Sequence, residues 1–427
     1  MNIGFGKFGK SIKFREKSWG IHGGDASPSI LLASLAKSNP DDTFYLIGKS
    51  DFSRLDLKRK LELFPNKNVI DIWDYANESE HEYQHPADCI RKNNIKIDSC
   101  IFMSGPTGCI SIPYKFRLLN SKKEDNMICK TMQFTEKYGA PIINYINETN
   151  IPYVTLCEDP RYFPLLARDL FYRPKITLGQ YNDIKERKHH KDYVEQDVFM
   201  ANVEVKYSGA ETIFAIAEEP YNIDELVSKK KLFMNLYLNQ GLGAGGLDRG
   251  PMVDEWILQN FNRNDIKIHG KWDSPWSEMD NFTSTGMSDL IDEMLATKYT
   301  LIIPIKAGWV TSKFWKMLHF GILPFMHPLY DTQSTIPVHD FLRVKTPEEF
   351  KKKIQILEDN PDKYEKLLRH TLKIFHDNIY NGKLLITNIY NSLYDVMDID
   401  KEYEYKFDSL DIPISSFNTK VKITKLF

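Results

Sequence analysis

Acidic side chains follow an apolar run in the middle of the chain. The run Ile151–Leu156 predicts a buried strand, and Glu158, Asp159 and Arg161 come directly after it. A carboxylate that is partly withdrawn from water gains proton affinity, which suits a general base that faces a hydroxyl group. This segment therefore predicts Asp159 as a catalytic base. The alternative is that Asp159 caps the next helix while Glu158 stays solvated.

A second acid ends the segment His22–Asp25, where two glycines precede it. The apolar stretch Ser29–Lys37 that follows predicts a helix. Adjacent glycines let the main chain approach a ligand closely, and a helix start offers free N–H groups to an anion. We regard Asp25 as the alternative base. A plain helix start, with Ser27 as the N-cap and Pro28 in the first turn, explains those two residues but not the glycines or the acid.

Five glycines lie within Asn239–Gly250, between the predicted strand Leu232–Leu236 and the predicted helix Met252–Asn260. This is more than a turn needs, and the main-chain N–H groups of such a loop can surround a diphosphate. Arg249 adds a charge and a guanidinium that can bind phosphate through two hydrogen bonds. No Gly-Lys-Ser/Thr sequence ends the loop, so it is not a Walker A motif. A flexible hinge between domains is the alternative.

A loop of small and basic residues, Lys306–Lys313, precedes the predicted helix Thr311–Phe320. We expect Thr311 and Ser312 to cap this helix, whose N–H groups would then bind phosphate. The lysines at both ends of the loop add positive charge, and Trp309 can stack on a base. An ordinary crossover with an amphipathic helix is the alternative.

Gly4, Gly6 and Gly9 match the spacing of the dinucleotide-binding fingerprint G-x-G-x-x-G. That fingerprint needs a strand before it and a helix that opens at the glycines. Only three residues precede Gly4, and the polar residues after Gly9 show no helical stripe. The sequence instead predicts a glycine-rich turn after a first strand, and a dinucleotide-dependent oxidoreductase is the least favoured function.

The 427 residues exceed the roughly 250–300 that one hydrophobic core holds, so we expect two domains. Lys and Arg number 56 against 58 Asp and Glu, and the formal charge of −2 gives no overall preference for nucleic acid. The five cysteines show no CxxC pair, which argues against a disulfide framework and a zinc site. No signal peptide or membrane-spanning run is recognisable. We expect a cytoplasmic monomer with no membrane partner.

Short apolar runs alternate with longer mixed segments, which is typical of parallel sheets with helical crossovers. We expect an α/β fold with two Rossmann-like domains facing a central cleft, over residues 1–228 and 229–395, and a tail over 396–427 that packs back on the first domain. The expected strands are Asn2–Phe5, Thr43–Ile47, Val69–Ile72, Ser99–Met103, Tyr153–Leu156, Thr212–Ile216, Leu232–Leu236, Ile266–His269, Tyr299–Ile305, Leu323–Met326 and Phe341–Val344. The expected helices are Ser29–Lys37, Glu124–Tyr138, Met252–Asn260, Ser288–Ala296, Thr311–Phe320 and one that begins after an N-cap at Thr346, with Pro347 and Glu349 completing its start.

Two parts of the sequence resemble known glycosyltransferases. Tyr299–Phe325 and the charged helical residues after it resemble the nucleotide-sugar domain of GT-B glycosyltransferases, where a helix start holds the diphosphate and the helix runs to a G-x-[LIV]-P turn, here Gly321–Pro324. In the first half, Asp98–Thr107 and Tyr153–Leu170 resemble the phage α-glucosyltransferases that glucosylate hydroxymethylcytosine in DNA. In that family an acid after the equivalent strand is the base, which corresponds to Asp159.

The resemblance implies a hexosyl- or pentosyltransferase that moves a sugar from a nucleotide-sugar, expected to be a UDP-sugar, to a hydroxyl group. The first domain would bind the acceptor and the second the donor. Donor contacts are expected from Gly23, Gly24, Gly243, Gly245, Arg249, Lys306, Gly308, Trp309, Thr311, Ser312 and Lys313. Acceptor contacts are expected from His22, Ser104, Thr107, Glu158 and Arg161.

The sequence departs from the GT-B pattern in the helix of the second domain. Many GT-B enzymes carry a glutamate there that accepts hydrogen bonds from the ribose, but the positions here hold Lys313, Trp315, Lys316 and His319. A lysine cannot accept a hydrogen bond, so Lys313 and Lys316 cannot replace that glutamate. No DxD-type acidic pair stands at a plausible metal site, so we expect no metal and no essential cofactor.

Double-stranded DNA with hydroxymethylated pyrimidines is the expected acceptor, and a phage-encoded protein would act in the host cytoplasm. The basic clusters Lys58–Lys60, Lys115–Lys123 and Lys185–Lys191 could face its phosphates, although charge runs are usually solvated surfaces. A glycan or protein acceptor is the first alternative. A non-catalytic nucleotide- or nucleic-acid-binding protein is the second.

Overall fold

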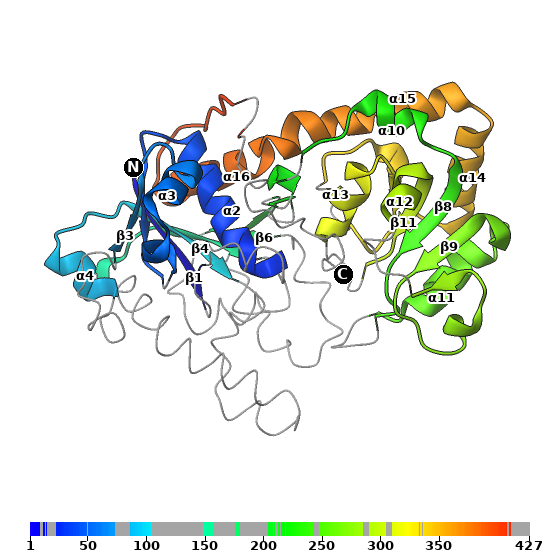
Figure 1. The fold of residues 1–427 in the computed structure, drawn as a ribbon, viewed down its shortest axis with the longest axis horizontal. Helices are drawn as coiled ribbons and strands as arrows, with labels where there is room; N and C mark the ends of the chain where they lie inside the picture. The colour runs from blue at the N-terminus through cyan, green and yellow to red at the C-terminus, as the bar shows by residue number, and fades with distance from the viewer. Residues whose placement is uncertain are drawn as a thin grey trace, which may run out of the picture. The chain divides into compact units, whose positions relative to one another are not determined.

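Two parallel β-sheets organise the chain, and each belongs to a separate unit (Figure 1). The computed structural model describes residues 1–8, 12, 14, 23–48, 50–72, 86–104, 148–157, 176–179, 204–207, 209, 212–213, 215–217, 219–241, 247–284, 290–304, 310–332, 334, 336–407 and 410. The first unit comprises Met1–Ala217 and resumes at Gly382, and the second comprises Glu218–Asn381. Both units are α/β with parallel strands, which confirms the predicted fold class.

The first sheet has the strand order β3-β2-β1-β4-β5-β6-β7, and all neighbouring strands are parallel. From β1 the chain adds β2 and β3 on one side and then β4 to β7 on the other, so the direction of winding reverses between β1 and β4. The strands are β1 (Asn2–Phe8), β2 (Thr43–Leu46), β3 (Val69–Asp71), β4 (Ser99–Ser104), β5 (Tyr153–Cys157), β6 (Ile176–Gly179) and β7 (Glu204–Tyr207).

The second sheet has the order β10-β9-β8-β11-β12 and is also parallel throughout. Here the winding reverses between β8 and β11, because the chain passes from β8 to β9 and β10 and then returns to the other side of β8. The strands are β8 (Leu232–Tyr237), β9 (Ile266–His269), β10 (Phe282–Thr283), β11 (Thr297–Ile302) and β12 (Leu323–Met326).

Helices connect and cover the strands in both units. The α-helices of the described residues are α2 (Gly23–Ser38), α3 (Leu57–Leu63), α4 (Pro86–Lys92), α10 (Ile223–Ser228), α11 (Arg249–Val253), α12 (Ile291–Ala296), α13 (Ser312–His319), α14 (Pro347–Glu358), α15 (Pro361–Phe375) and α16 (Lys383–Val396). Two π-helical turns, η8 (Asp254–Leu258) and η13 (His376–Tyr380), extend α11 and α15, and the 3₁₀ turns are η1 (Phe52–Arg54), η6 (Ala215–Ala217), η9 (Arg263–Asp265), η10 (Trp276–Glu278) and η12 (Asp340–Leu342). None of the helices in the described part of the chain has the length and apolarity to cross a membrane.

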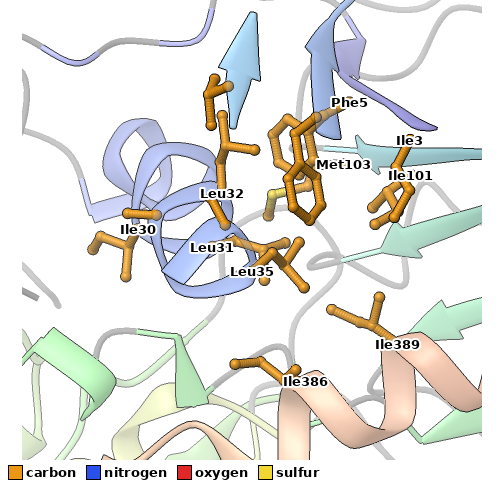
Figure 2. Packing of buried hydrophobic residues seen from close by; sticks show 14 of the residues in the cluster. Ile3, Phe5, Ile30, Leu31, Leu32, Leu35, Ile101, Met103, Ile386 and Ile389 are labelled. Carbon is orange, nitrogen blue, oxygen red and sulfur yellow. The ribbon is translucent and has the colours of Figure 1, made fainter. Parts of the chain in front are cut away.

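The core of the first unit forms where α2 meets the central strands. Ile30, Leu31, Leu32 and Leu35 of α2 are buried with side chains of β1 and β4. Figure 2 shows these leucines facing Phe5 and Met103, with Ile386 and Ile389 of α16 closing the same cluster. Apolar burial is the main stabilising contribution to such a unit, so α2 and the start of β1 are fixed by the core rather than by a ligand.

Helix α16 belongs to the first unit, although the sequence analysis placed it within 229–395. It lies against β5 and β6, and the hydroxyl of Tyr390 donates to Asp42 at 2.6 Å. Tyr403, which follows the helix, stacks on Tyr390 with ring centroids 4.4 Å apart and donates to Asn39 at 2.8 Å. The chain therefore returns to the first unit at Gly382 and residues 401–407 pack there.

Two expected strands are wrong. Thr212–Ile216 instead contains a turn, in which the Thr212 hydroxyl donates to the carbonyl of Gly209 at 2.6 Å, followed by η6. Phe341–Val344 overlaps η12 and makes only an isolated bridge to Met326. Short apolar runs predict burial but do not distinguish a strand from a tight turn. The strands β6, β7 and β10 were not expected, and the expected helix Glu124–Tyr138 lies outside the described residues.

Gly4 and Gly6 lie inside β1, so the expected glycine-rich turn at these residues is wrong. A Cβ atom at Gly4 would lie 2.8 Å from the sulfur of Cys100, and one at Gly6 would lie 3.1 Å from the ring of Phe102. The glycines are needed because the side chains of Cys100 and Phe102 in β4 and of Ile47 pack against this face of β1. This close packing is a structural reason for the G-x-G pattern and leaves no role for a dinucleotide at these two positions.

The helix expected over Ser29–Lys37 starts earlier than predicted. Helix α2 begins at Gly23, so Ser27 and Pro28 lie within it and the expected N-cap at Ser27 is wrong. Pro28 has no N–H to donate to the carbonyl of Gly24. By contrast, α14 starts as predicted: the Thr346 hydroxyl accepts the N–H of Glu349 at 3.1 Å.

Candidate functional site at the carboxyl ends of β8 and β11

The carboxyl ends of β8 and β11 lie where the winding of the second sheet reverses. The strands pair directly, and β8 ends at Tyr237 while β11 ends at Ile302. In an open α/β sheet the ligand binds beside such a reversal, at the carboxyl ends of the strands. Both loops that the sequence analysis assigned to the diphosphate start here. Within them, residues 242–246 and 305–309 lie outside the described residues.

Arg249 joins the segments that follow the two strands. It is the first residue of α11, whose N-cap Asp248 accepts the N–H of Gly250 at 3.0 Å. The Arg249 side chain is buried; its Nη1 donates to the carbonyl of Asn239 at 2.9 Å and its Nε to the carbonyl of Pro304 at 3.2 Å. Burial lowers the pKa of this guanidinium to about 10, so the group stays charged at neutral pH. Its other N–H donors make no hydrogen bond within the described residues.

Lys313 reaches the same place from the first turn of α13. Its Nζ donates to the main-chain carbonyl of Tyr237, the last residue of β8. Burial holds the pKa of Lys313 well below its usual range, and the positive charge of Arg249 lowers it further. Two basic side chains thus converge on the ends of β8 and β11. Because like charges withdrawn from water repel each other, a bound anion would stabilise this arrangement.

The start of α13 is held by a tyrosine rather than by its own cap. Thr311 occupies the N-cap position, but its hydroxyl makes no bond to the first turn, so the expected capping role of that hydroxyl is wrong. Its main-chain N–H instead donates to the buried hydroxyl of Tyr330 at 2.9 Å, and that hydroxyl donates to the Thr311 carbonyl at 3.0 Å. Ser312 is the first helical residue. The Thr311 hydroxyl therefore does not occupy the N–H groups of the first turn.

Gln240 is a buried residue of this site that the sequence analysis missed. Its Oε1 accepts the N–H of Asp273 at 3.0 Å, and its Nε2 donates to Asp248 at 3.4 Å. Its main-chain carbonyl accepts the N–H of Arg249 at 3.1 Å, while its own N–H donates to the carbonyl of Lys271 at 3.0 Å. Gln240 thus ties the loops after β8 and β9 to the start of α11. A single glutamine among glycines carries no spacing signal that would reveal this.

Two of the five glycines in 239–250 have local structural roles. Gly250 packs under η10, and a Cβ atom there would lie 2.5 Å from the indole nitrogen of Trp276. Gly241 has a φ of 96°, a main-chain conformation that residues with a Cβ atom rarely adopt. Gly243, Gly245 and Gly246 lie outside the described residues. A diphosphate is therefore not needed to explain every glycine of this loop.

A buried polar cluster supports β8 on one face of the sheet. Glu293 of α12 lies 2.6 Å from Nε2 of His269 and accepts from Asn235 at 2.7 Å. The His269 ring stacks on Tyr237 with centroids 5.2 Å apart, and its Nδ1 lies 2.8 Å from the Thr283 hydroxyl. Burial lowers the pKa of His269, and Glu293 opposes this shift. The cluster fixes the strand end whose carbonyl binds Lys313.

The body of α13 packs into the core. Trp315 stacks on Phe375, with centroids 5.5 Å apart and planes 8° apart. Nδ1 of His319 lies 2.5 Å from the hydroxyl of Tyr380, and Lys316 lies over the ring of Phe320. These positions offer no carboxylate to a ribose, as the sequence predicts.

In the first sheet, Phe8, Ser104, Cys157 and Gly179 are in register at the carboxyl edge. Ser104 ends β4 at the reversal between β1 and β4. Gly23, Gly24 and Asp25 form the first residues of α2. The other expected site residues, His22, Thr107, Glu158, Asp159, Arg161, Lys306, Gly308 and Trp309, lie outside the described residues. Within the described residues, no three His, Cys, Asp or Glu side chains are arranged to hold a metal ion.

Comparisons with known proteins find similar structures but no matching family. No protein family matches the chain, and no curated protein matches it. T4 phage β-glucosyltransferase, solved in complex with its UDP-glucose substrate, is similar with a TM-score of 0.49 and 12% identity, over 93% of this chain and 100% of that one. Anabaena Alr3699/HepE, solved in complex with UDP, is similar with a TM-score of 0.43 and 10% identity, over 93% and 100%.

Proposed function

We propose that this protein is a GT-B glycosyltransferase that transfers a sugar from a UDP-sugar to a hydroxyl group. The observation that carries the proposal is the convergence of Arg249 and Lys313 on the ends of β8 and β11, beside the start of α13. A pair of basic side chains at the reversal of a doubly wound sheet suits a diphosphate, which takes up negative charge as the sugar leaves. The GT-B pattern over Tyr299–Phe325 supports the same donor.

The chemistry assigned to the second unit is stabilisation of the leaving group. As the bond between the anomeric carbon and the diphosphate breaks, charge accumulates on the β-phosphate oxygen. Arg249, Lys313 and the N–H groups of α13 offset that charge, and positions fixed in advance make this effective. Lys306, Gly243, Gly245, Gly308, Trp309 and Ser312 belong to the same proposed donor site, and Gly23 and Gly24 are further proposed donor contacts.

The acceptor side is assigned to the first unit. Asp159 would take the proton of the attacking hydroxyl, with Asp25 as the alternative base. His22, Ser104, Thr107, Glu158 and Arg161 would contact the acceptor. The support is positional, since Ser104 ends β4 at the reversal and Glu158 and Asp159 follow the last residue of β5.

Within this class we propose DNA with hydroxymethylated pyrimidines as the acceptor, from the sequence resemblance of Asp98–Thr107 and Tyr153–Leu170. One of the three basic clusters is described by the structure. In it, Lys58 is exposed, Arg59 pairs with Glu62 at 2.7 Å, and Lys60 lies 4.7 Å from the ring centroid of Phe52. Only one of these three side chains is fully available to a phosphate, so this cluster adds little support.

Two measurements on the full chain test the proposal. Calorimetry with UDP and UDP-glucose, the ligands named with the similar structures, should show binding that Lys313→Met weakens strongly. Transfer is then assayed with labelled UDP-glucose and duplex DNA with or without hydroxymethylcytosine. DNA binding should weaken with salt at a slope near one per phosphate neutralised. Donor binding without transfer to DNA redirects the search to glycan or protein acceptors, and failure to bind either nucleotide contradicts the donor site.

A further inference from the structure

A groove on the second unit shares no lining residue with the proposed donor site. It has a volume of about 400 Å³ and lies between η12, α14 and α15. Its apolar lining comes from Phe341, Leu357 and Leu367. Leu357 is fully buried, whereas Phe341 and Leu367 are half-buried, so the apolar atoms are recessed below the surface.

The rim of the groove is basic. Lys363, Lys366 and His370 line it from one face of α15, at the spacing that places helical side chains in a row, and His339 faces His370 with ring centroids 5.9 Å apart. Among the described residues, neither Lys363 nor Lys366 forms an ion pair. Helix α15 nevertheless contains acidic residues, so the absence of ion pairs at these two lysines is not due to a lack of acids in the helix.

The other basic residues of α15 are neutralised locally. Arg369 pairs with Glu365 at 2.7 Å and with Asp224 at 2.6 Å, and Lys373 pairs with Asp377 at 2.7 Å. The lysines without an acidic partner are therefore confined to the face of α15 that borders the apolar groove. Unpaired charge around recessed apolar surface is what a complementary partner would cover.

We propose that this groove docks an acidic amphipathic segment of a partner protein. An aliphatic or aromatic side chain of that segment would enter the groove against Leu357 and Leu367, while its carboxylates pair with Lys363 and Lys366. A helix laid in a hydrophobic groove uses this combination of apolar anchors and flanking charge.

The contacts of Phe341 favour a peptide over nucleic acid. Nζ of Lys353 and of Lys363 lie 5.3 Å and 5.7 Å from its ring centroid, and the ring also packs on Phe325 at 6.2 Å. A base would need a free aromatic face on which to stack, and this ring is already surrounded. A bilayer is disfavoured because it needs protruding apolar side chains, and those of the groove are recessed.

The test uses the full chain and a fluorescent amphipathic helical peptide of glutamate and leucine. Anisotropy should show saturable binding that the double variant Lys363→Glu, Lys366→Glu weakens by about tenfold or more. The matched control is Lys351→Glu, Lys352→Glu, which makes the same charge change at exposed residues of α14 outside the groove. Circular dichroism checks that both variants fold.

Any of the following results would overturn the proposal. The first is absence of peptide binding, or equal loss in both double variants. The second is equal affinity for a peptide with lysine in place of glutamate. The third is stronger binding to a thymidine oligonucleotide or to phosphatidylserine vesicles than to the acidic peptide. A further variant, Leu367→Ser, should weaken the acidic peptide without changing the charge of the rim.

Discussion

Nε of Arg249 donates to the main-chain carbonyl of Pro304 at 3.2 Å, which links the start of α11 to the end of β11. The same guanidinium donates to Asn239, after β8, at 2.9 Å. One side chain therefore spans the point where the winding of the sheet reverses. This makes Arg249 a structural tie as well as a cation that faces the proposed diphosphate.

Replacing Arg249 should separate these two roles. Arg249→Met removes the charge and leaves two carbonyls without a donor, so we expect a loss of about 2–4 kcal/mol in the free energy of unfolding and no measurable UDP binding. Arg249→Lys keeps the charge but cannot reach both carbonyls. It should bind UDP weakly and recover part of the stability. Urea unfolding and calorimetry measure the two effects, and unchanged UDP affinity in Arg249→Met would contradict the proposed donor site.

Gln240 is predicted to position Arg249 without touching the donor. Gln240→Ala removes the side-chain bonds to Asp273 and Asp248, so the start of α11 should loosen. We expect KM for the donor to rise about tenfold at nearly constant kcat, together with a loss of about 1–3 kcal/mol in stability. The exposed Gln259, which bonds Asp254 at 2.7 Å, is the matched control. If Gln259→Ala raises KM as much as Gln240→Ala does, Gln240 has no special role.

The sequence predicted the sheets better than it predicted the site. The predicted bounds of Leu323–Met326 match β12 to the residue, because this buried parallel strand is a continuous apolar segment. The predicted bounds of Ile266–His269 also match β9 to the residue, although Lys267 in that strand is exposed. The sequence also placed Arg249 and Lys313 in loops after two strands of one sheet, and the carboxyl ends of parallel strands lie at the same edge of the sheet. The hydrogen-bond partners of these two side chains could not be predicted, because they are main-chain carbonyls, which every residue has. Tyr330 could not be foreseen either, since it reaches Thr311 only through the folding of β12 beside β11.

The second unit should lose stability in mild acid because of His327. Burial lowers the pKa of this side chain to about 4 from an ordinary value of 6.5, and its ring packs on Trp256 at 4.6 Å. At a pH between about 4 and 6.5, His327 is therefore protonated in the unfolded chain but mostly neutral in the folded chain. The free energy of unfolding should therefore fall as pH drops from about 6.5 to about 4, by at most about 3 kcal/mol from this group.

The variant His327→Gln tests this assignment by chemical denaturation across that pH range. It should flatten the pH dependence without abolishing it, because burial also lowers the pKa of His269 and of His376. A pH profile that is identical in His327→Gln and in the unmodified protein would show that protonation occurs elsewhere.

Asp159→Asn is predicted to abolish transfer while leaving the donor site intact. Removing a general base should lower turnover by about 10²–10⁴-fold, with UDP affinity unchanged, since the base acts on the acceptor. Asp25→Asn is the comparison. Loss of turnover only in Asp25→Asn moves the base to that residue, and normal turnover in both variants removes both assignments.

Binding of UDP is predicted to change the protonation state of Lys313. Its pKa is held low first by burial and then by the charge of Arg249. A bound diphosphate supplies negative charge beside the ammonium and raises that pKa towards or above its ordinary value. At a pH between the low pKa of the free protein and the higher pKa of the complex, UDP binding should therefore take up a proton.

Calorimetry of UDP binding in buffers of different ionisation enthalpy measures this uptake directly. The apparent binding enthalpy should vary with the buffer for the unmodified protein, and the uptake should vanish at pH values below the low pKa, where Lys313 is already charged. Lys313→Arg keeps a cation that stays protonated throughout, so it should bind UDP without proton uptake. If Lys313→Arg and the unmodified protein take up the same number of protons, the titrating group is not Lys313. If neither takes up any, the diphosphate does not bind beside this side chain.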